Sequence, residues 1–524
     1  MLFFKGKINI LLLIFSLLVL FASLSLGRFA EDQELQQCQH QCKQQRQFDS
    51  KDRHECERAC ERYIKEKERR EKEHDQERER RSRDEIVGRR EEEEEEEEEQ
   101  VGGESGAPYV FDEQHFETKF REQEGYVRVL KRFSKRSRLL EGIENYRVLI
   151  FAANPQTFVV PNHWDADVVL FVAQGEGTVS LVYTDRRESF NVERGHVMVI
   201  PAGVTAYLVN RGNNEKLVIV KLLNPVSNPT GKFETFFGAG GQNPQSFLNA
   251  FSTEILEAAY KTSGDRLKRI FSQQSEGAII RASEEQISAL THEKSSHWPF
   301  GGKSLRDSGP IQLFRKDPKE SNAFGTLFET DFDDRRLGQQ LQNLDIAVAF
   351  ANITQGSMHT PYYNSRATKI AVVTSGRGRF QMACPHVSKS GHSRRHEQHQ
   401  HHQYHDGKTW RGDESTTPVH YERITAELRE GTVFVVPPGH PFVTLASEDQ
   451  NLEVVCFEIN AEKNHKFALA GQRNIFKNFK REAKELAFAS SAEEVERVFE
   501  SQDEEFFFPG PRQRGGRRGY YSII

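Results

Sequence analysis

The sequence predicts an internally duplicated all-β protein with two tandem β-barrels, each followed by a helical segment. Three observations predict this plan. Short apolar runs, separated by Gly, Pro and Asn, follow one another closely from about residue 109, which is typical of all-β barrels and sandwiches. The pattern Gly-x5-Pro-x-Gly ends one run at residues 195–203 and another at residues 431–439. A stretch with helical spacing of apolar residues follows each set of runs.

The predicted strands occur in two sets. In the first half they are 127–133, 146–153, 168–173, 178–183, 196–200 and 217–223, and in the second half 346–353, 370–374, 433–436 and 452–459. The helical stretches also correspond, because Phe251 and Leu267 lie 228 residues before Phe479 and Val495. Such a repeat indicates one structural plan used twice. We therefore expect a barrel and helical arm in residues 108–300 and again in residues 301–510, with a C-terminal tail at 511–524.

Residues 1–29 are predicted to be a secretory signal peptide. Lys5 and Lys7 precede an apolar run from residue 8 to residue 26, and small residues follow at a suitable cleavage position. The apolar run has 19 residues, which also allows a retained membrane anchor. We expect cleavage and entry into the secretory route.

Four of the six cysteines form two C-x3-C pairs within residues 30–65, namely Cys38, Cys42, Cys56 and Cys60. On helices, residues four apart lie on one face, so two helices folded back on each other bring the pairs together. The simplest disulfides are Cys38–Cys60 and Cys42–Cys56, although four cysteines allow three connectivities. A zinc site is the alternative, but it favours tighter spacing and a reducing compartment. We expect a disulfide-stapled helical hairpin.

Residues 66–107 are dominated by charged residues and Gln and include an unbroken Glu run at 91–99. This composition buries too little apolar surface to offset chain entropy, so we expect a disordered acidic linker. The formal net charge of the 524-residue chain is only −6. Neither the charge nor its distribution predicts a nucleic-acid surface.

The repeated Gly/Pro pattern resembles the second signature motif of cupins, in which a metal-binding His follows the second Gly after two further residues. That place holds Ala206 in the first half and Phe442 in the second. The first half keeps His163 but has Asp165 and Leu170 where another His and a Glu are expected. The second half has Tyr363, Ser365 and Ala371 at the corresponding places. Since a catalytic metal needs several N/O ligands around an open position, we expect no enzyme and no required cofactor.

Residues 108–510 resemble the vicilin-type 7S seed globulins, most closely their sucrose-binding branch. The resemblance rests on the stretch 161–167 leading to Gly175-Glu-Gly177, the stretch 361–367 leading to Gly376-Arg-Gly378, the two Pro-x-Gly motifs, and Phe-Phe-Phe-Pro-Gly at 506–510. It implies two jelly-roll barrels and a flat homotrimer in which helical arms of neighbouring subunits dock. An amphipathic arm outside a closed barrel independently needs such a partner.

A second kind of metal site is suggested by Cys384 and His386, which lie two apart on a predicted strand and therefore share a face. His420 begins the next predicted segment. The vicilin resemblance adds Tyr109, because some vicilins bind copper at a Cys-x-His, a distant His and a Tyr. Thiolate and imidazole suit copper or zinc. The alternative is a free Cys and two surface His beside a loop.

A sugar site needs an aromatic platform with flanking carboxylates or amides in a cleft. His163, Trp164, Asp165 and Asp167 have this chemistry at one predicted barrel mouth. Tyr362, Tyr363 and Asn364 have it at the other. The alternative is that these aromatics belong to the core or to an interface. Only the resemblance points to sucrose.

Two functions follow from these features. The first is a non-enzymatic sucrose-binding protein of the secretory route, peripheral at the outer plasma-membrane face or in vacuoles, that assists sucrose uptake in seeds. The second is a storage globulin, packed as a trimer and later digested. A third possibility is release of the N-terminal hairpin as a defence peptide. Asn352-Ile-Thr354 is a glycosylation sequon, although Asn352 falls on a predicted strand.

Overall fold

The computed structural model describes residues 58–60, 62, 107–227, 229–241, 243–291, 309–334, 337–385 and 421–511. The chain divides into two units, Met1–Ser105 and Gly106–Ile524. In the first unit Cys60 lies in a short helical stretch, is buried and is disulfide-bonded. Cys38, Cys42 and Cys56 lie outside the described residues, as do the predicted signal peptide and nearly all of the linker and tail. The stapled hairpin therefore stays a prediction.

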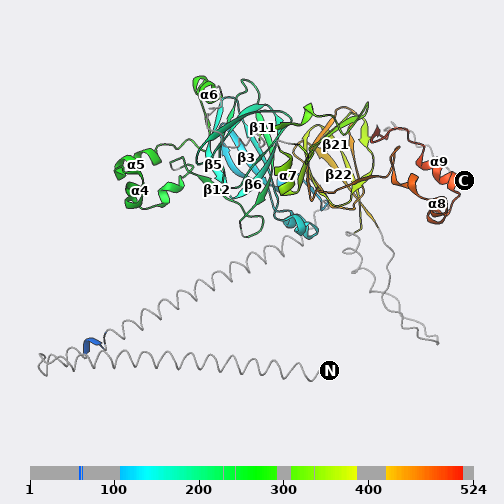
Figure 1. Cartoon of the computed structure of the whole chain (residues 1–524), viewed down its shortest axis with the longest axis horizontal. Helices are drawn as coiled ribbons and strands as arrows, with labels where there is room; N and C mark the ends of the chain where they lie inside the picture. The colour runs from blue at the N-terminus through cyan, green and yellow to red at the C-terminus, as the bar shows by residue number, and fades with distance from the viewer. Residues whose placement is uncertain are drawn as a thin grey trace, which may run out of the picture. The chain divides into compact units, whose positions relative to one another are not determined.

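The second unit contains two β-barrels, each built from two antiparallel sheets (Figure 1). In the first barrel, sheet 1a has the order β14-β9-β6-β11-β4-β3-β2 and sheet 1b the order β12-β5-β10-β7-β8, with β13 beside β5. The strands of the first barrel are β2 (Phe116–Glu122), β3 (Gly125–Leu130), β4 (Arg147–Ala153), β5 (Thr157–Trp164), β6 (Ala166–Gln174), β7 (Glu176–Val182), β8 (Arg187–Glu193), β9 (His196–Ile200), β10 (Thr205–Asn210), β11 (Leu217–Pro225), β12 (Thr235–Phe237), β13 (Ile279–Arg281) and β14 (Ile311–Gln312).

The second barrel repeats this topology. Sheet 2a has the order β1-β23-β20-β25-β17-β16-β15, and sheet 2b the order β22-β21-β24-β18-β27, with β19 beside β24 and β26. Its strands are β1 (Val110–Phe111), β15 (Glu320–Asn322), β16 (Gly325–Glu329), β17 (Ile346–Ile353), β18 (Ser357–His359), β19 (Tyr362–Asn364), β20 (Thr368–Ser375), β21 (Arg377–Cys384), β22 (Glu422–Arg429), β23 (Val433–Val436), β24 (Phe442–Ala446), β25 (Leu452–Ile459), β26 (Lys466–Ala468) and β27 (Phe507–Pro509). The predicted duplicated all-β fold is confirmed.

Sheets 1a and 2a are covered on both faces, which explains their near-continuous apolar sequences. In β6, Val168, Leu170 and Val172 face the core of the first barrel. Val169 and Phe171 belong instead to a core that also contains residues of sheet 2a. Phe171 stacks on Phe350 of β17 with ring centroids 5.6 Å apart. The alternation of strand side chains thus joins the two barrels through one shared apolar layer.

The two barrels exchange their first strands. β1 precedes the first barrel in sequence, yet it pairs with β23 of the second barrel, with Phe111 opposite Val433. β14 begins the second half, yet it pairs with β9 of the first barrel, with Ile311 opposite Val197. Phe111 is fully buried and Ile311 is 5% exposed. Each strand therefore joins the sheet of the other half, across the boundary expected at residue 300.

The repeated Gly/Pro pattern has a backbone cause. The glycines that begin it, Gly195 and Gly431, have φ values of 90° and 83°, and those that end it, Gly203 and Gly439, have φ values of 75° and 76°. Residues with a Cβ adopt these values at a cost. The pattern therefore marks the two tight turns that precede and follow β9 and β23.

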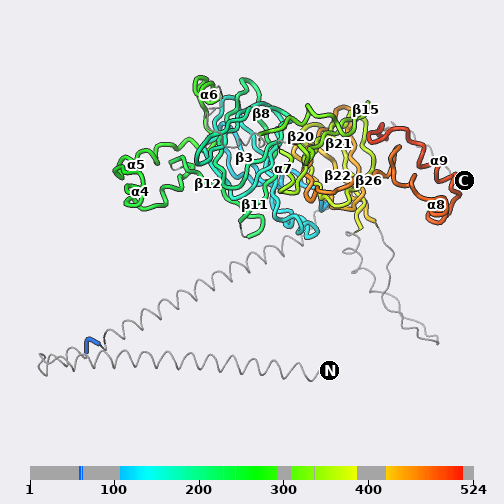
Figure 2. The backbone as a smooth tube through the Cα atoms, viewed as in Figure 1, coloured from blue at the N-terminus to red at the C-terminus, as the bar shows by residue number. Residues whose placement is uncertain are grey.

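Helices form the two arms and a few connections. They are α3 (Phe133–Arg136), α4 (Thr253–Tyr260), α5 (Gly264–Ser272), α6 (Glu284–Thr291), α7 (Gly338–Leu344), α8 (Arg481–Phe488) and α9 (Ala492–Phe499), with 3-10 turns at Glu113–His115, Arg138–Ile143, Phe247–Ala250, Leu313–Arg315 and Ile475–Asn478. The arm α4–α5 leaves the first barrel and the arm α8–α9 leaves the second, at opposite ends of this unit (Figure 2). Within the described ranges, no helix has the length and apolar character needed to cross a membrane.

Candidate ligand cavity in the first barrel

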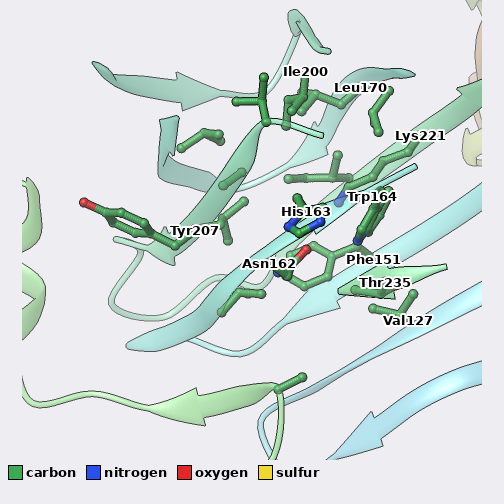
Figure 3. A pocket seen from close by; sticks show the side chains of 18 of the residues that line it. Val127, Phe151, Asn162, His163, Trp164, Leu170, Ile200, Tyr207, Lys221 and Thr235 are labelled. Atoms are coloured by element: carbon green, nitrogen blue, oxygen red, sulfur yellow. The ribbon is translucent and has the colours of Figure 1, made fainter. Parts of the chain in front are cut away.

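The first barrel encloses a cavity of about 80 Å³ between sheets 1a and 1b (Figure 3). Its walls are mainly apolar, for example Phe151 of β4, Leu170 of β6 and Ile219 of β11. Polar side chains enter from β5, where His163 and Trp164 lie, from β11 with Lys221, and from β12 with Thr235. No Asp or Glu of the described residues lines it.

Lys221 is the one lysine among the described lining residues, and its surroundings are aromatic. Its ammonium lies 4.6 Å from the centroid of the Trp164 ring and 5.4 Å from that of Phe151, within the range of cation–π attraction. Burial lowers the pKa of Lys221 to about 8, because removal from water disfavours the charged form.

Two further polar atoms in this cavity lack hydrogen-bond partners. Trp164 Nε1 and Thr235 Oγ1 are both buried, and neither has a partner within the described part of the chain. Buried donors of this kind are rare in native proteins and indicate an unseen ligand, water or ion. These two atoms and the Lys221 ammonium are three of the groups in the cavity able to donate a hydrogen bond.

The cavity occupies the place where a catalytic cupin holds its metal. His163, Leu170 and Ala206, which stand at three of the four expected ligand positions, all line it. Only the imidazole can bind a metal. No group of three or more His, Cys, Asp or Glu side chains within the described ranges is arranged to hold a metal ion.

Of the predicted sugar-site residues in the first barrel, the structure places His163 and Trp164 at the cavity. His163 stacks on Phe236 with centroids 5.0 Å apart. Asp165 instead accepts hydrogen bonds from Ser227 Oγ and, at 2.7 Å, from the backbone N–H of Glu234. Asp167 accepts one from the N–H of Ala202 at 3.0 Å. Both carboxylates therefore hold loops in place.

The predicted sugar-site residues of the second barrel are separate from this cavity. Tyr362 is 5% exposed and packs against Phe442 with ring centroids 4.5 Å apart. Tyr363 stacks on Phe467 at 5.2 Å. Asn364 is buried and its side chain accepts a hydrogen bond from Asn464 at 3.3 Å. Aromatic packing fills this interior where the first barrel has its cavity.

A buried charge network crosses the interior of the second barrel. Lys369 of β20 and Glu458 of β25 are 3% and 1% exposed, and Lys369 Nζ lies 2.5 Å from Glu458 Oε1. Lys466 lies 3.5 Å from the same oxygen and 2.7 Å from Glu329 Oε2. Burial alone would raise the pKa of Glu458, but the two ammonium groups outweigh it and lower this pKa to about 2.

The structure describes two of the four residues of the predicted copper or zinc site, Tyr109 and Cys384. Cys384 Sγ donates to Tyr109 Oη at 3.6 Å, although the two are 275 residues apart. The exchange of β1 brings Tyr109 there, since its carbonyl accepts a hydrogen bond from the N–H of Val435 in β23. His386 and His420 lie outside the described residues. The sequence did not single out His440, whose ring centroid is 6.2 Å from that of Tyr109.

The sequon residue Asn352 lies on β17, opposite Thr326 of β16 and Glu453 of β25. It is half-buried, and its side-chain oxygen is buried without a hydrogen-bond partner within the described residues. Its glycosylation stays a prediction.

The fold and the cavity define a two-barrel cupin, and the family model described as "Cupin" matches residues 142–268 and 311–496. The chain is 51% identical to vicilin Jug r 6.0101 of Juglans regia over 98% of this chain and 99% of the relative. It is 43% identical to a sucrose-binding protein of Glycine max over 98% and 99%. The chain belongs to the vicilin family of 7S storage globulins.

A solved vicilin from Solanum melongena, described as having different anionic ligands in structurally similar pockets, superposes with a TM-score of 0.68 at 37% identity. The superposition covers 78% of this chain and 99% of that one. The predicted resemblance to vicilins is thus confirmed. The non-enzymatic character expected from the missing cupin ligands agrees with the family.

Sequence reasoning missed Lys221, Lys369 and Glu458. Lys221 stood inside the predicted strand 217–223, and Glu458 inside the strand 452–459. A charged residue within an otherwise apolar strand is almost never buried without a reason. That exception to the pattern is the signal that identifies Lys221 and Glu458, whereas Lys369 lies one residue before the predicted strand 370–374.

Proposed function

We propose that this protein is a seed storage globulin that reaches the storage vacuole by the secretory route and assembles as a homotrimer through its arms. The observation that carries the proposal is an apolar surface repeated on both arms. Ile255 and Ile270 of the first arm are 57% and 58% exposed, and Leu486 and Val498 of the second are 85% and 60% exposed. Contiguous exposed apolar surface marks interaction sites. Both arms carry it because the plan is duplicated.

Light scattering after size-exclusion chromatography tests the assembly. Leu486→Asp places a charge in the proposed contact, and we expect the trimer to dissociate into folded monomers. Glu482→Gln, an exposed polar change on the same helix, is the control and should remain trimeric. A trimer that survives Leu486→Asp would refute the arm contact.

Protein abundance through seed development tests storage itself. We expect the chain to accumulate during seed filling within storage vacuoles and to be degraded after imbibition, as measured by quantitative mass spectrometry of fractionated tissue. Low, constant abundance at the plasma membrane would overturn the proposal and favour the uptake role.

Sucrose binding is the second candidate function, favoured by the similarity to the Glycine max protein along nearly the whole chain. His163 and Trp164 supply suitable chemistry at the cavity mouth. However, ligand clefts are commonly about 300–1,000 Å³, whereas this cavity measures about 80 Å³. A disaccharide therefore requires the barrel to open or a site on the surface.

Titration calorimetry of the purified trimer with sucrose tests this role, with maltose and glucose as controls. A saturable, sucrose-selective signal supports binding, and loss of the signal in Trp164→Ala or in Tyr363→Ala identifies the barrel responsible. No heat at millimolar sucrose from folded trimer excludes it.

A small carboxylate suits the cavity better than a sugar does. Lys221 supplies a positive charge, and Trp164 Nε1 and Thr235 Oγ1 supply buried donors without partners in the described structure. We propose that the first barrel binds an anion of acetate size. Calorimetry with acetate at pH 6 should show binding that Lys221→Met abolishes, and equal binding by both proteins would refute the site.

Release of residues 31–65 as a defence peptide is a separate proposal that rests on the cysteine spacing. Mass spectrometry of mature seed tissue tests it. A disulfide-bonded peptide spanning the four N-terminal cysteines supports release, and recovery of these residues only on the full-length chain refutes it.

A further inference from the structure

Three lysines of the barrel interiors, Lys221, Lys369 and Lys466, differ in their partners. Lys369 and Lys466 each lie within 2.7 Å of a carboxylate oxygen. Lys221 has aromatic rings around it instead, with Trp164 at 4.6 Å and Phe151 at 5.4 Å. No carboxylate of the described residues lines its cavity. Lys221 therefore lies inside the barrel without a neighbouring carboxylate of the kind that keeps Lys369 and Lys466 charged.

Desolvation makes the neutral amine form of Lys221 more populated than that of an ordinary lysine. With a pKa of about 8 instead of 10.5, the neutral fraction at pH 7 is about 300-fold larger than for an ordinary lysine. Neutral amines in apolar pockets are the nucleophiles that attack carbonyl groups in Schiff-base chemistry. At pH 7 the ammonium is still the major form, about ten times the neutral amine, and it is the form that binds an anion, so the two properties coexist.

The cavity limits what reaches this amine. One water needs about 10–15 Å³ of such space, so a cavity of about 80 Å³ holds a molecule of a few heavy atoms. The walls near Lys221 are Phe151, Leu170 and Ile219, which suit an alkyl chain. Trp164 Nε1 and Thr235 Oγ1 are available to donate hydrogen bonds to a carbonyl oxygen.

We propose that Lys221 captures short aliphatic aldehydes as a covalent imine inside the first barrel. The Nζ lone pair attacks the carbonyl carbon, and the C=O π electrons move to oxygen. A proton passes from nitrogen to that oxygen and gives a carbinolamine. The hydroxyl then leaves with a proton as water, and the C=N bond forms. Amine plus aldehyde gives imine plus water, so no oxidant or reductant takes part.

This inference goes beyond storage and shares only the cavity with the small-anion proposal. An aldehyde-modified Lys221 loses much of its positive charge at neutral pH, so capture and anion binding compete for one side chain. Acetate should therefore slow the capture.

Reductive trapping on the native full-length protein tests the proposal. The trimer is incubated with butanal at pH 7, reduced with cyanoborohydride, digested and analysed by mass spectrometry. We expect Lys221 to acquire a butyl group at least tenfold faster than exposed Lys480, with Lys369 and Lys466 unlabelled. Decanal should label Lys221 no faster than Lys480, because its chain exceeds the cavity. Labelling should rise with pH around a midpoint near 8.

Comparison of lysines within one protein makes the test independent of any variant's folding. Lys221→Met, if folded, should remove only the fast label. Labelling of Lys221 at or below the rate of Lys480, or at equal rates for butanal and decanal, overturns the proposal. Neither result bears on the storage proposal, which is tested by seed abundance and by the mass of the trimer. Acetate binding without aldehyde trapping would support the anion site and refute aldehyde capture.

Discussion

The two barrels share a strand plan but have opposite interiors. Ile200 and Val436 precede the motif prolines and pair with Val168 and Lys369, respectively. Two residues further along, Leu170 lies opposite Lys221 and Ala371 opposite Cys456. The first barrel therefore has a lysine and a cavity where the second has a thiol beside a paired lysine and glutamate.

This difference shows that the duplicated scaffold does not determine the chemistry inside it. The second barrel keeps its buried charges by pairing them, and Tyr362 and Phe442 fill the remaining space. The first barrel has a charge without a carboxylate near it in the described structure, together with unfilled space. The interior of the second barrel therefore depends on its ion pairs for stability. In the first barrel, desolvation of the Lys221 ammonium lowers stability, and a bound ligand can offset this cost.

The largest expected effect is on the second barrel. Glu458→Gln leaves Lys369 buried beside a neutral amide, and we expect the free energy of unfolding to fall by about 3–5 kcal/mol. Chemical denaturation of both variants measures it. Glu427→Gln, which removes the exposed pair with Arg379, should cost less than about 1 kcal/mol. Equal losses in the two variants would show that the network is dispensable.

The second-largest effect on the free energy of unfolding is expected when the second barrel is acidified. Burial lowers the pKa of His359 to about 4 from 6.5, so between these values the unfolded chain binds a proton that the folded chain does not. Stability present above pH 6.5 is therefore lost as the pH falls to 4, by about 3 kcal/mol. Glu458 adds a further loss from pH 4.5 to about 2. In His359→Gln the free energy of unfolding, measured at a series of pH values, should not fall between pH 6.5 and pH 4. A fall as steep as in the unmodified protein would contradict the assignment to His359.

In the first barrel, Lys221→Met should increase the free energy of unfolding, which is the opposite of the effect of Glu458→Gln. Below pH 8 the folded state bears the cost of a desolvated ammonium, so its removal should raise the free energy of unfolding by about 1–3 kcal/mol at pH 7. The gain should shrink as the pH rises from 8 to 10.5, where the unfolded lysine also loses its proton. Denaturation across this range measures it, and a loss of stability at pH 7 would show that the ammonium is compensated.

The smallest effect on stability is expected at the predicted metal site. Cys384→Ser keeps a donor to Tyr109, so the free energy of unfolding should change by less than about 1.5 kcal/mol. We expect copper bound per subunit, measured by elemental analysis after dialysis, to be lost in this variant and retained in Cys456→Ser. Equal copper in both variants would remove Cys384 from the ligand set.

Much of the fold was predictable because it rests on local backbone requirements. The motif glycines adopt positive φ in both barrels, so their spacing revealed the duplication. The helical arms followed from apolar periodicity at Leu267 and Val495. β1 and β14 were not predictable, because a two-residue strand has no periodicity to detect. Their partners are set by tertiary packing.

The site was predicted less well for a physical reason. Asp165 and Asp167 have the chemistry of sugar ligands, but their oxygens accept hydrogen bonds from neighbouring loops. Sequence alone cannot show which acceptors are already satisfied. The structure places Trp164, a predicted sugar-site residue, at the cavity, whereas Lys221, which gives the cavity its charge, was hidden in a predicted core strand.

The exchange of β1 and β14 has a consequence for the order of events during synthesis. The ribosome completes β9 at Ile200, but the strand that covers the edge of its sheet begins at Ile311. The edge of sheet 1a at β9 therefore stays uncovered while only the N-terminal half has been translated. Conversely, if a protease cuts the finished chain between the halves, β1 stays paired with β23 of the second barrel and β14 stays paired with β9 of the first. The complete sheets therefore need both halves of the chain, and the exchanged strands still connect the halves after a single cut.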